Sequence, residues 1–295
     1  MLLPDFIREG AAALEALYPP EEARSLVLRL CEDLCGFQPF DYIVKPQTEV
    51  PEELHAALGR LVDGEPLQYV SGFQFFRGRK FKVSPSVLIP RPETEMLVDC
   101  AVRHLEHYPH GAKVLDLCTG SGCIAWSIAL EVPGAMVTGV DISEEALAVA
   151  SSQFAGGAAG AGAVAAAGVA FRAPRFEKAD LLAVPETFPG APFDVITANP
   201  PYIRESERLT MHTNVLEHEP ELALFVPDDD ALRFYRAIAL WAQSFLKPGG
   251  WGIVEINEEL GEQTAAVFER TGMKSVTIIP DFFGKDRFVS FEKAA

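Results

Sequence analysis

The chain of 295 residues has no long apolar run, no closely paired cysteine motif and no excess of basic charge. A membrane-spanning helix needs about 20 consecutive apolar residues, so the sequence predicts no transmembrane segment. The opening residues Met-Leu-Leu-Pro-Asp lack the basic region and apolar stretch of an export signal. The five cysteines contain no CxxC spacing, which fits free thiols in a reducing compartment. We therefore expect a cytoplasmic protein without disulfide bonds.

The charge balance is strongly acidic, with a formal net charge of −17 at pH 7. This charge disfavours broad binding to nucleic acid and permits a basic protein partner. We expect no membrane contact, no direct nucleic-acid binding and a monomeric chain. Cys31 and Cys35 lack further ligands, and His104, His107 and His110 fit solvated surface near the end of a helix. No metal site is predicted.

Apolar spacing predicts helices in the first 70 residues, over residues 5–17, from Pro20 to a stop at Gly36, and from Pro51 to before Gly64. We assign 1–70 to a small helical domain, 71–90 to a β-hairpin linker and 91–295 to the main domain. The helical domain has two interpretations, a stabilising cap or a recognition module for a macromolecular substrate. We adopt the hypothesis that this domain, residues 1–70, recognises the substrate.

From residue 91 onward predicted strands and helices alternate, which indicates an α/β fold with a mostly parallel sheet and helices on both faces. An Ala/Gly-rich stretch over 155–168 reads as a flexible surface insertion. In such folds, ligands bind beyond the carboxyl ends of the strands. The candidate site residues are therefore those that follow the predicted strands.

Three strand ends carry polar or glycine residues. The first strand leads through Asp116 into a glycine turn. The turn consists of Cys118, Thr119, Gly120, Ser121 and Gly122. Glycines there allow the backbone to approach a ligand closely. The second strand ends at Asp141, where an acidic residue can bind both ribose hydroxyls of an adenosine. The third candidate is Asp180-Leu181, placed beside an adenine with Leu181 as an apolar wall.

A fourth strand, residues 193–197, runs into Asn199-Pro200-Pro201-Tyr202. The prolines cannot continue the strand, so they form a stiff corner. Asn199 and the Pro200 carbonyl can each accept one N–H of a planar NH₂ group, and Tyr202 can cover the acceptor and contact a cationic methyl group. The alternative interpretation is a Pro-Pro turn that closes a strand, with Tyr202 as packing.

The glycine turn also fits the dinucleotide pattern G-x-G-x-x-A, residues 120–125. Two features favour S-adenosylmethionine over NAD. Asp116 precedes the glycines, where a carboxylate suits a cationic cofactor better than a pyrophosphate. The corner at Asn199 suits a nitrogen that accepts a methyl group and offers nothing for hydride transfer.

These landmarks together resemble the protein-(glutamine-N5) methyltransferases that modify peptide chain release factors (HemK/PrmC type). The resemblance spans about residues 65–292 and rests on Glu65-Pro66-Leu67-Gln68-Tyr69, Ile89–Glu95, Asp116–Gly122, Asp141-Ile142-Ser143, Asn199–Ile203, and Glu219-Pro220 with Ala223-Leu224. Asn-Pro-Pro-Tyr alone is shared with adenine-N6 methyltransferases of DNA and RNA. The stretch Ile89–Glu95 is much more specific.

The resemblance implies a Rossmann-like, seven-stranded class I methyltransferase domain with an antiparallel last strand, beside a small N-terminal helical domain. It implies S-adenosylmethionine contacts in Cys118–Gly122 and at Asp141, Leu181 and Asn199. Asn199–Tyr202 would hold the glutamine of the Gly-Gly-Gln motif of a release factor. Cys118 departs from the family's usual glycine, and Leu181 stands where some members have an aromatic residue.

Two other functions stay open. An adenine-N6 methyltransferase acting on RNA or DNA should carry a basic groove or a target-recognition insertion, and the sequence shows neither. A catalytically silent binding module is disfavoured by intact Asp141, Asn199 and Tyr202.

Overall fold

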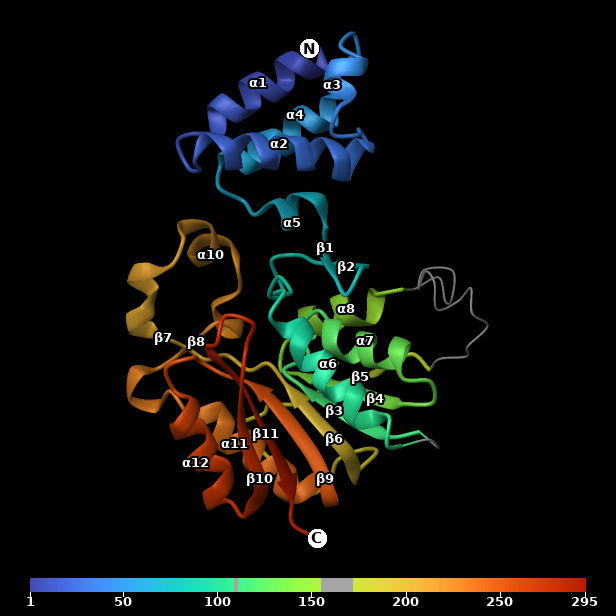
Figure 1. Cartoon of the computed structure of the whole chain (residues 1–295), viewed down its shortest axis with the longest axis vertical. Helices are drawn as coiled ribbons and strands as arrows, with labels where there is room; N and C mark the ends of the chain where they lie inside the picture. Colours follow the sequence, from blue (N-terminus) through green and yellow to red (C-terminus); the bar gives the residue numbers. More distant parts are fainter. Residues whose placement is uncertain (109–110, 155–171) are drawn as a thin grey trace. The chain divides into compact units, whose positions relative to one another are not determined.

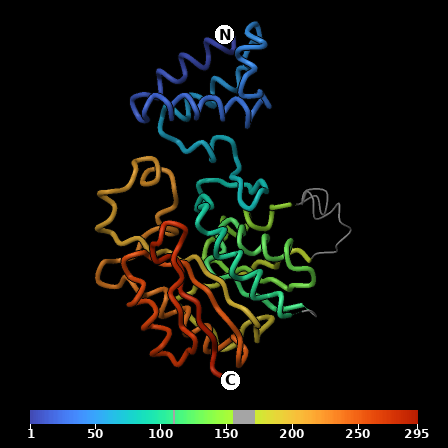
Figure 2. The backbone as a smooth tube through the Cα atoms, viewed as in Figure 1, coloured from blue at the N-terminus to red at the C-terminus, as the bar shows by residue number. Residues whose placement is uncertain are grey.

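The computed structural model describes residues 1–108, 111–154 and 172–295. The chain divides into two compact units, Met1–Phe73 with Met211–His218, and Gln74–Thr210 with Glu219–Ala295 (Figure 2). The proposed boundary after residue 70 lies close to Phe73, but the proposed domains did not place Met211–His218 with the N-terminal helices. The proposed insertion at 155–168 lies outside the described residues.

The first unit is helical. Its helices are α1 (Leu3–Leu14), α2 (Pro20–Cys35), α3 (Asp41–Val44), α4 (Glu52–Val62), α5 (Leu67–Ser71) and α10 (Thr213–His218). The three predicted helices are confirmed, and α3, α5 and α10 were not predicted because they are only four to six residues long. Gly36 ends α2 with a left-handed φ of 70°, as its predicted stop requires. Asn214 of α10 donates a hydrogen bond to the Tyr18 hydroxyl, a long-range contact without a local sequence signal.

The second unit is built on a seven-stranded sheet of order β10-β11-β9-β6-β3-β4-β5 (Figure 1). Its strands are β3 (Lys113–Leu117), β4 (Met136–Asp141), β5 (Arg175–Lys178), β6 (Phe193–Ala198), β9 (Leu246–Glu255), β10 (Met273–Pro280) and β11 (Asp286–Lys293). Strand β11 pairs antiparallel with both β10 and β9, whereas β9, β6, β3, β4 and β5 run parallel. The α/β fold with an antiparallel last strand is confirmed. The predicted hairpin is also present, as β1 (Phe73–Phe76) and β2 (Arg79–Lys82). A further short pair is formed by β7 (Ile203–Arg204) and β8 (Phe225–Val226).

Helices cover both faces of the sheet. They are α6 (Thr94–Leu105), α7 (Cys123–Glu131), α8 (Glu144–Ser152), α11 (Arg233–Phe245) and α12 (Gly261–Arg270), with short 3₁₀ turns at Glu205–Thr210, Glu221–Ala223 and Asp228–Asp230. Side chains of the central strand β3 alternate between two cores. Leu115 and Leu117 join the core beneath α11 and α12, and Val114 joins the core beneath α6 and α7. Burial on both faces fixes β3 and therefore fixes the loop that leaves its carboxyl end.

One surface prediction was wrong. His104 was expected to be solvated, but its ring is partly buried and stacks on Trp251, with the ring centroids 4.5 Å apart. Burial lowers the pKa of His104. His107 is exposed, as predicted, and His110 lies outside the described residues. Among the helices that the structure describes, none is long and apolar enough to cross a membrane.

Candidate cofactor and substrate site

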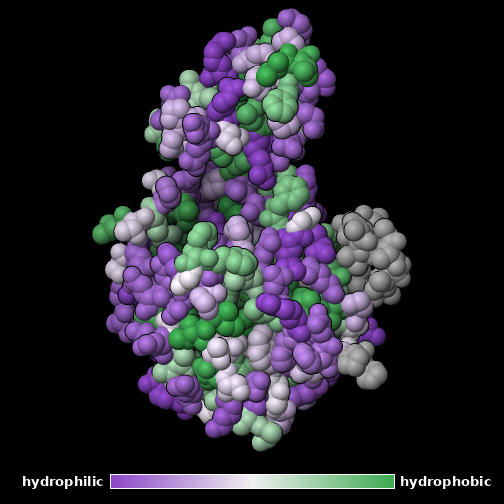
Figure 3. Space-filling model, in the orientation of Figure 1, coloured by the Kyte–Doolittle hydropathy of each residue, from purple (hydrophilic) through white to green (hydrophobic). Residues whose placement is uncertain are grey.

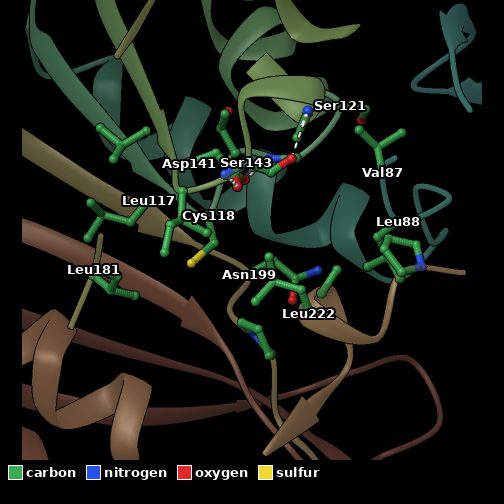
Figure 4. A pocket seen from close by; sticks show the side chains of 18 of the residues that line it. Val87, Leu88, Leu117, Cys118, Ser121, Asp141, Ser143, Leu181, Asn199 and Leu222 are labelled. Atoms are coloured by element: carbon green, nitrogen blue, oxygen red, sulfur yellow. Dashed lines mark hydrogen bonds between the residues drawn. The ribbon is translucent and has the colours of Figure 1, made fainter. Parts of the chain in front are cut away.

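A cavity of about 480 Å³ lies at the carboxyl ends of β3, β4 and β6 (Figure 4). Nine of the proposed site residues line it, namely Cys118, Thr119, Gly120, Ser121, Asp141, Asp180, Leu181, Asn199 and Pro201. Asp116, Gly122, Pro200 and Tyr202 do not line it. The structure thus brings most of the strand-end residues together at one site, and these four adjoin the lining residues in the chain without forming part of the lining.

The loop after β3 turns sharply through left-handed backbone. Cys118, Gly120 and Gly122 have φ values of 56°, 53° and 79°. A residue with a β-carbon is strained there, which explains why a glycine suits the position that Cys118 occupies. A β-carbon on Gly122 would approach Trp126 and Ala150 to 3.1 Å. Gly122 therefore serves the turn and the packing of α7, and its contact with cofactor stays a prediction.

Asp141 at the end of β4 fixes two neighbouring loops. One carboxylate oxygen accepts the backbone N–H of Gly120 at 2.9 Å, and the other accepts that of Ser143 at 3.0 Å. Ser143 in turn caps α8 through the N–H of Ala146, as a serine before a helix predicts. Burial raises the pKa of Asp141, and these backbone hydrogen bonds oppose the rise. The carboxylate is thus held at the cavity wall in a fixed orientation.

Asp116 lies beneath the cavity and is fully buried. Its carboxylate accepts hydrogen bonds from the hydroxyls of Thr119 at 2.6 Å and Thr197 at 2.8 Å. Burial raises the pKa of Asp116 to about 7. Asp116 orients the Thr119 hydroxyl and places a negative charge close to the cavity, and its predicted contribution to cofactor binding stays a prediction.

The cavity near Cys118 is electrostatically negative. The pKa of the Cys118 thiol is raised first by burial and then by the charges of Asp141, Asp116 and Asp180. Three carboxylates that act on one point in a poorly solvated site favour a positively charged ligand. This is the field that a sulfonium cation requires.

The corner after β6 is held by a buried hydrogen-bond chain. Asn199 Nδ2 donates to Thr94 Oγ1 at 3.2 Å, and the Thr94 hydroxyl donates to Glu255 Oε2 at 2.7 Å. Because the Thr94 hydrogen goes to the carboxylate, the Thr94 oxygen is left to accept from the amide NH₂ of Asn199. The side-chain oxygen of Asn199 is consequently the end of the amide that can accept a hydrogen bond from a ligand.

Tyr202 joins the same chain from the other side. Its hydroxyl donates to Glu255 Oε1 at 3.0 Å. Glu255 is 1% exposed, and burial raises its pKa against the effect of its two hydroxyl partners. The hydroxyl thus anchors the corner, and Tyr202 does not line the cavity, so the expectation that its ring covers the acceptor stays a prediction.

Thr94 and Glu255 were not predicted as site residues. Thr94 lies within the stretch Ile89–Glu95, which carried the family resemblance but was given no role at the site. Glu255 offered one signal, a carboxylate inside the otherwise apolar stretch 251–256. A buried charge in a strand needs polar partners, and those partners mark the site.

A second buried carboxylate connects two parts of the cavity wall. Glu219 is 4% exposed, accepts the backbone N–H of Ile89 at 3.2 Å and pairs with Arg91 at 2.6 Å. This ties the stretch before α6 to the segment that contributes Pro220, Leu222 and Ala223 to the lining. Both segments therefore take fixed positions at the cavity.

Comparison with known proteins identifies the family. Residues 109–275, more than half of the chain, match a family model described as a methyltransferase domain. A release factor glutamine methyltransferase of Bacteroides thetaiotaomicron is 41% identical over 289 residues, which are 97% of each chain. The chain belongs to the release factor glutamine methyltransferase family.

A further curated relative and a solved structure are also similar to this chain. A Flavobacterium psychrophilum protein of the same name is 32% identical over 295 residues, 98% of each chain. A solved protein-(glutamine-N5) methyltransferase (release factor-specific) from Alicyclobacillus acidocaldarius shares 30% identity over 73% of this chain and all of its own, with a TM-score of 0.42. The similarity to the curated relatives spans both units of this methyltransferase.

The cavity fits S-adenosylmethionine, the cofactor of this methyltransferase. The carboxylate of Asp141 faces the cavity and can accept ribose hydroxyls. Ile142, Leu181 and Leu182 supply apolar walls for the adenine. The negative field of Asp116, Asp141 and Asp180 suits the sulfonium. These assignments are our expectations for the bound state.

The charge of Asp116 should make cofactor discrimination depend on pH. Asp116 is ionised above its pKa of about 7 and neutral below it. We expect the affinity for cationic S-adenosylmethionine, relative to neutral-sulfur S-adenosylhomocysteine, to fall about tenfold from pH 8 to pH 5.5, as the loss of a nearby charge predicts. In Asp116→Asn the affinity ratio should change less. Titration calorimetry of both ligands across this range measures it, and an identical pH dependence in the variant would contradict the assignment.

The Thr94 hydroxyl should control turnover without controlling cofactor binding. Thr94→Val keeps the side-chain shape but removes the bonds to Asn199 and Glu255, so we expect kcat to fall about 10- to 100-fold through misorientation. Thr94→Ser retains the hydroxyl and should retain most of kcat. Steady-state kinetics, thermal unfolding and calorimetry with S-adenosylmethionine separate these effects. Equal losses in the Val and Ser variants would show that the hydroxyl is not responsible.

Proposed function

We propose that this enzyme transfers a methyl group from S-adenosylmethionine to the side-chain amide nitrogen, N5, of the glutamine in the Gly-Gly-Gln motif of peptide chain release factors. The observation that carries the proposal is the orientation of the Asn199 amide, whose NH₂ group donates one hydrogen bond to Thr94. An amide oxygen at the cavity wall is an acceptor for the NH₂ group of another amide. The family to which the chain belongs supports the choice of glutamine.

The chemistry needs positioning more than acid–base groups. Bound S-adenosylmethionine supplies an electrophilic methyl group on a sulfonium sulfur. Asn199 Oδ1 and the Pro200 carbonyl accept the two N–H bonds of the glutamine amide. They thereby orient its nitrogen and stabilise the positive charge that develops on it. The nitrogen forms the new N–C bond, the S–C bond electrons stay on sulfur, and the methylated nitrogen releases one proton to water.

The chain does not need a dedicated general base in this scheme, because the methylated amide nitrogen is strongly acidic. Glu255 is the nearest carboxylate to the corner that we have described, but both of its oxygens already accept hydrogen bonds. Glu255 therefore acts as an anchor. We also propose that the enzyme acts in the cytoplasm. The helical unit would then contribute to the recognition of the folded release factor.

The direct test is transfer of labelled methyl groups to a purified release factor and to the same factor with the Gly-Gly-Gln glutamine changed to alanine. We expect label on the first and none on the second. Equal label on both would move the acceptor elsewhere on the factor. Label on RNA or DNA, with none on either protein, would favour the adenine-N6 alternative, because an exocyclic adenine NH₂ fits the same corner.

Loss of the Asn199 amide should remove most of the turnover. We expect Asn199→Ala to lower kcat about 10²- to 10³-fold, as for the loss of one transition-state hydrogen bond at an oxyanion hole. The side chain is a cavity-wall residue and not part of the apolar core, so folding should be retained. Gln243→Ala, on the exposed side of α11, is the matched control and should keep normal kcat. Turnover near that of the control would rule out the mechanism.

A further inference from the structure

The turn between β10 and β11 exposes two adjacent phenylalanines. Phe282 is 86% exposed and Phe283 is 83% exposed, whereas phenylalanines such as Phe268, Phe288 and Phe291 are fully buried. Isolated exposed apolar residues are common, but two large neighbouring rings in water are costly and typical of a contact site. Figure 3 shows one face of the protein, on which hydrophobic residues lie among hydrophilic ones.

The turn is held by several hydrogen bonds and ion pairs despite its exposure. The carboxylate of Asp281, which is 7% exposed, accepts the backbone N–H groups of Phe283 at 2.8 Å and Lys285 at 3.1 Å. It also pairs with Arg287 at 3.1 Å. Lys285 and Arg287 both bind Glu258, at 2.9 and 3.3 Å. A rigid turn loses little conformational entropy when a partner covers the rings, so it is a suitable docking element.

The turn is continuous with the corner that holds Asn199. Phe288 of β11 pairs with Glu255 of β9, so the residues before Phe288 extend past the end of β9. The backbone N–H of Ile256 donates to the carbonyl of Arg287 at 2.9 Å. Asn257 then donates to the carbonyl of Tyr202 at 3.3 Å. The turn between β10 and β11, which contains Phe282 and Phe283, therefore lies at the carboxyl end of the parallel strands, as the cavity does. Figure 1 shows β10 and β11 beside β9.

We propose that the turn Asp281–Lys285 is a docking site for the release factor, with Phe282 and Phe283 seated against an apolar part of its protein surface. The inference rests on the proposed function, because a protein that presents a glutamine to Asn199 must cover this edge of the sheet. Apolar rings suit a protein surface, and the net charge of −17 disfavours a nucleic acid as the occupant. The contact supplies substrate affinity away from the reacting atoms.

The test compares Phe282→Ser/Phe283→Ser with the unmodified enzyme in steady-state methylation of a purified, intact release factor. We expect the KM for the factor to rise about 10- to 100-fold, as for aromatic anchors of protein interfaces. The kcat at saturating factor and the Kd for S-adenosylmethionine should stay unchanged. The matched control is Met136→Ser, which replaces a residue that is 40% exposed at the start of β4, the opposite edge of the sheet.

The outcomes separate the docking site from the proposed function. An unchanged KM in the double variant, with normal methylation by the unmodified enzyme, would overturn the docking site alone. A similar rise of KM in Met136→Ser, or a double variant whose kcat or cofactor affinity falls in parallel, would also overturn it. If the unmodified enzyme does not methylate the factor, the proposed function fails and the release factor is excluded as the occupant.

Discussion

The site depends on how the buried carboxylate of Glu255 is satisfied. A charged group that is removed from water needs a hydrogen-bond partner for each oxygen, and here the partners are the hydroxyls of Thr94 and Tyr202. Thr94 belongs to the start of α6 and Tyr202 to the corner after β6, so one carboxylate fixes two separate segments. Because Thr94 donates its hydrogen to Glu255, its oxygen can only accept, and the Asn199 amide must turn its NH₂ group towards Thr94. The chemistry at the cavity thus follows from a hydrogen-bond requirement inside strand β9.

Asp116 repeats the arrangement on strand β3. Its carboxylate is also satisfied by two hydroxyls, those of Thr119 and Thr197. A hydroxyl provides a hydrogen bond without neutralising the charge, unlike the lysine or arginine partner of an ion pair. Asp116 therefore orients Thr119 and keeps its ionised form available to act on a cationic ligand. Burial without a cationic partner is what raises the pKa of Asp116.

The sequence predicted those features that depend on local patterns. Strand ends, glycine turns and the N-cap at Ser143 follow from residue type and spacing, and the fold class follows from their alternation. The partners of Glu255 could not be predicted, because Thr94 is 161 residues away in the chain. For the same reason the sequence did not show that Tyr202 donates to Glu255 or that Asp116 accepts from Thr119 and Thr197. Residue type predicted their place at a strand end, but only the tertiary structure shows which side of the cavity wall each side chain occupies.

The antiparallel last strand explains why a contact element lies beside the reacting corner. Two neighbouring parallel strands run in the same direction, so the chain that connects them must cross from the carboxyl end of the first to the amino end of the second. Strand β11 instead reverses direction between β10 and β9, so its preceding turn lies at the carboxyl edge, where β3, β4 and β6 also end. A tight turn at that edge can be rigid, because its ends are already paired in the sheet. The topology therefore places Phe282 and Phe283 at the same end of the sheet as Asn199, with β11 and β9 between β10 and β6, while the cavity is lined by the loops of the parallel strands.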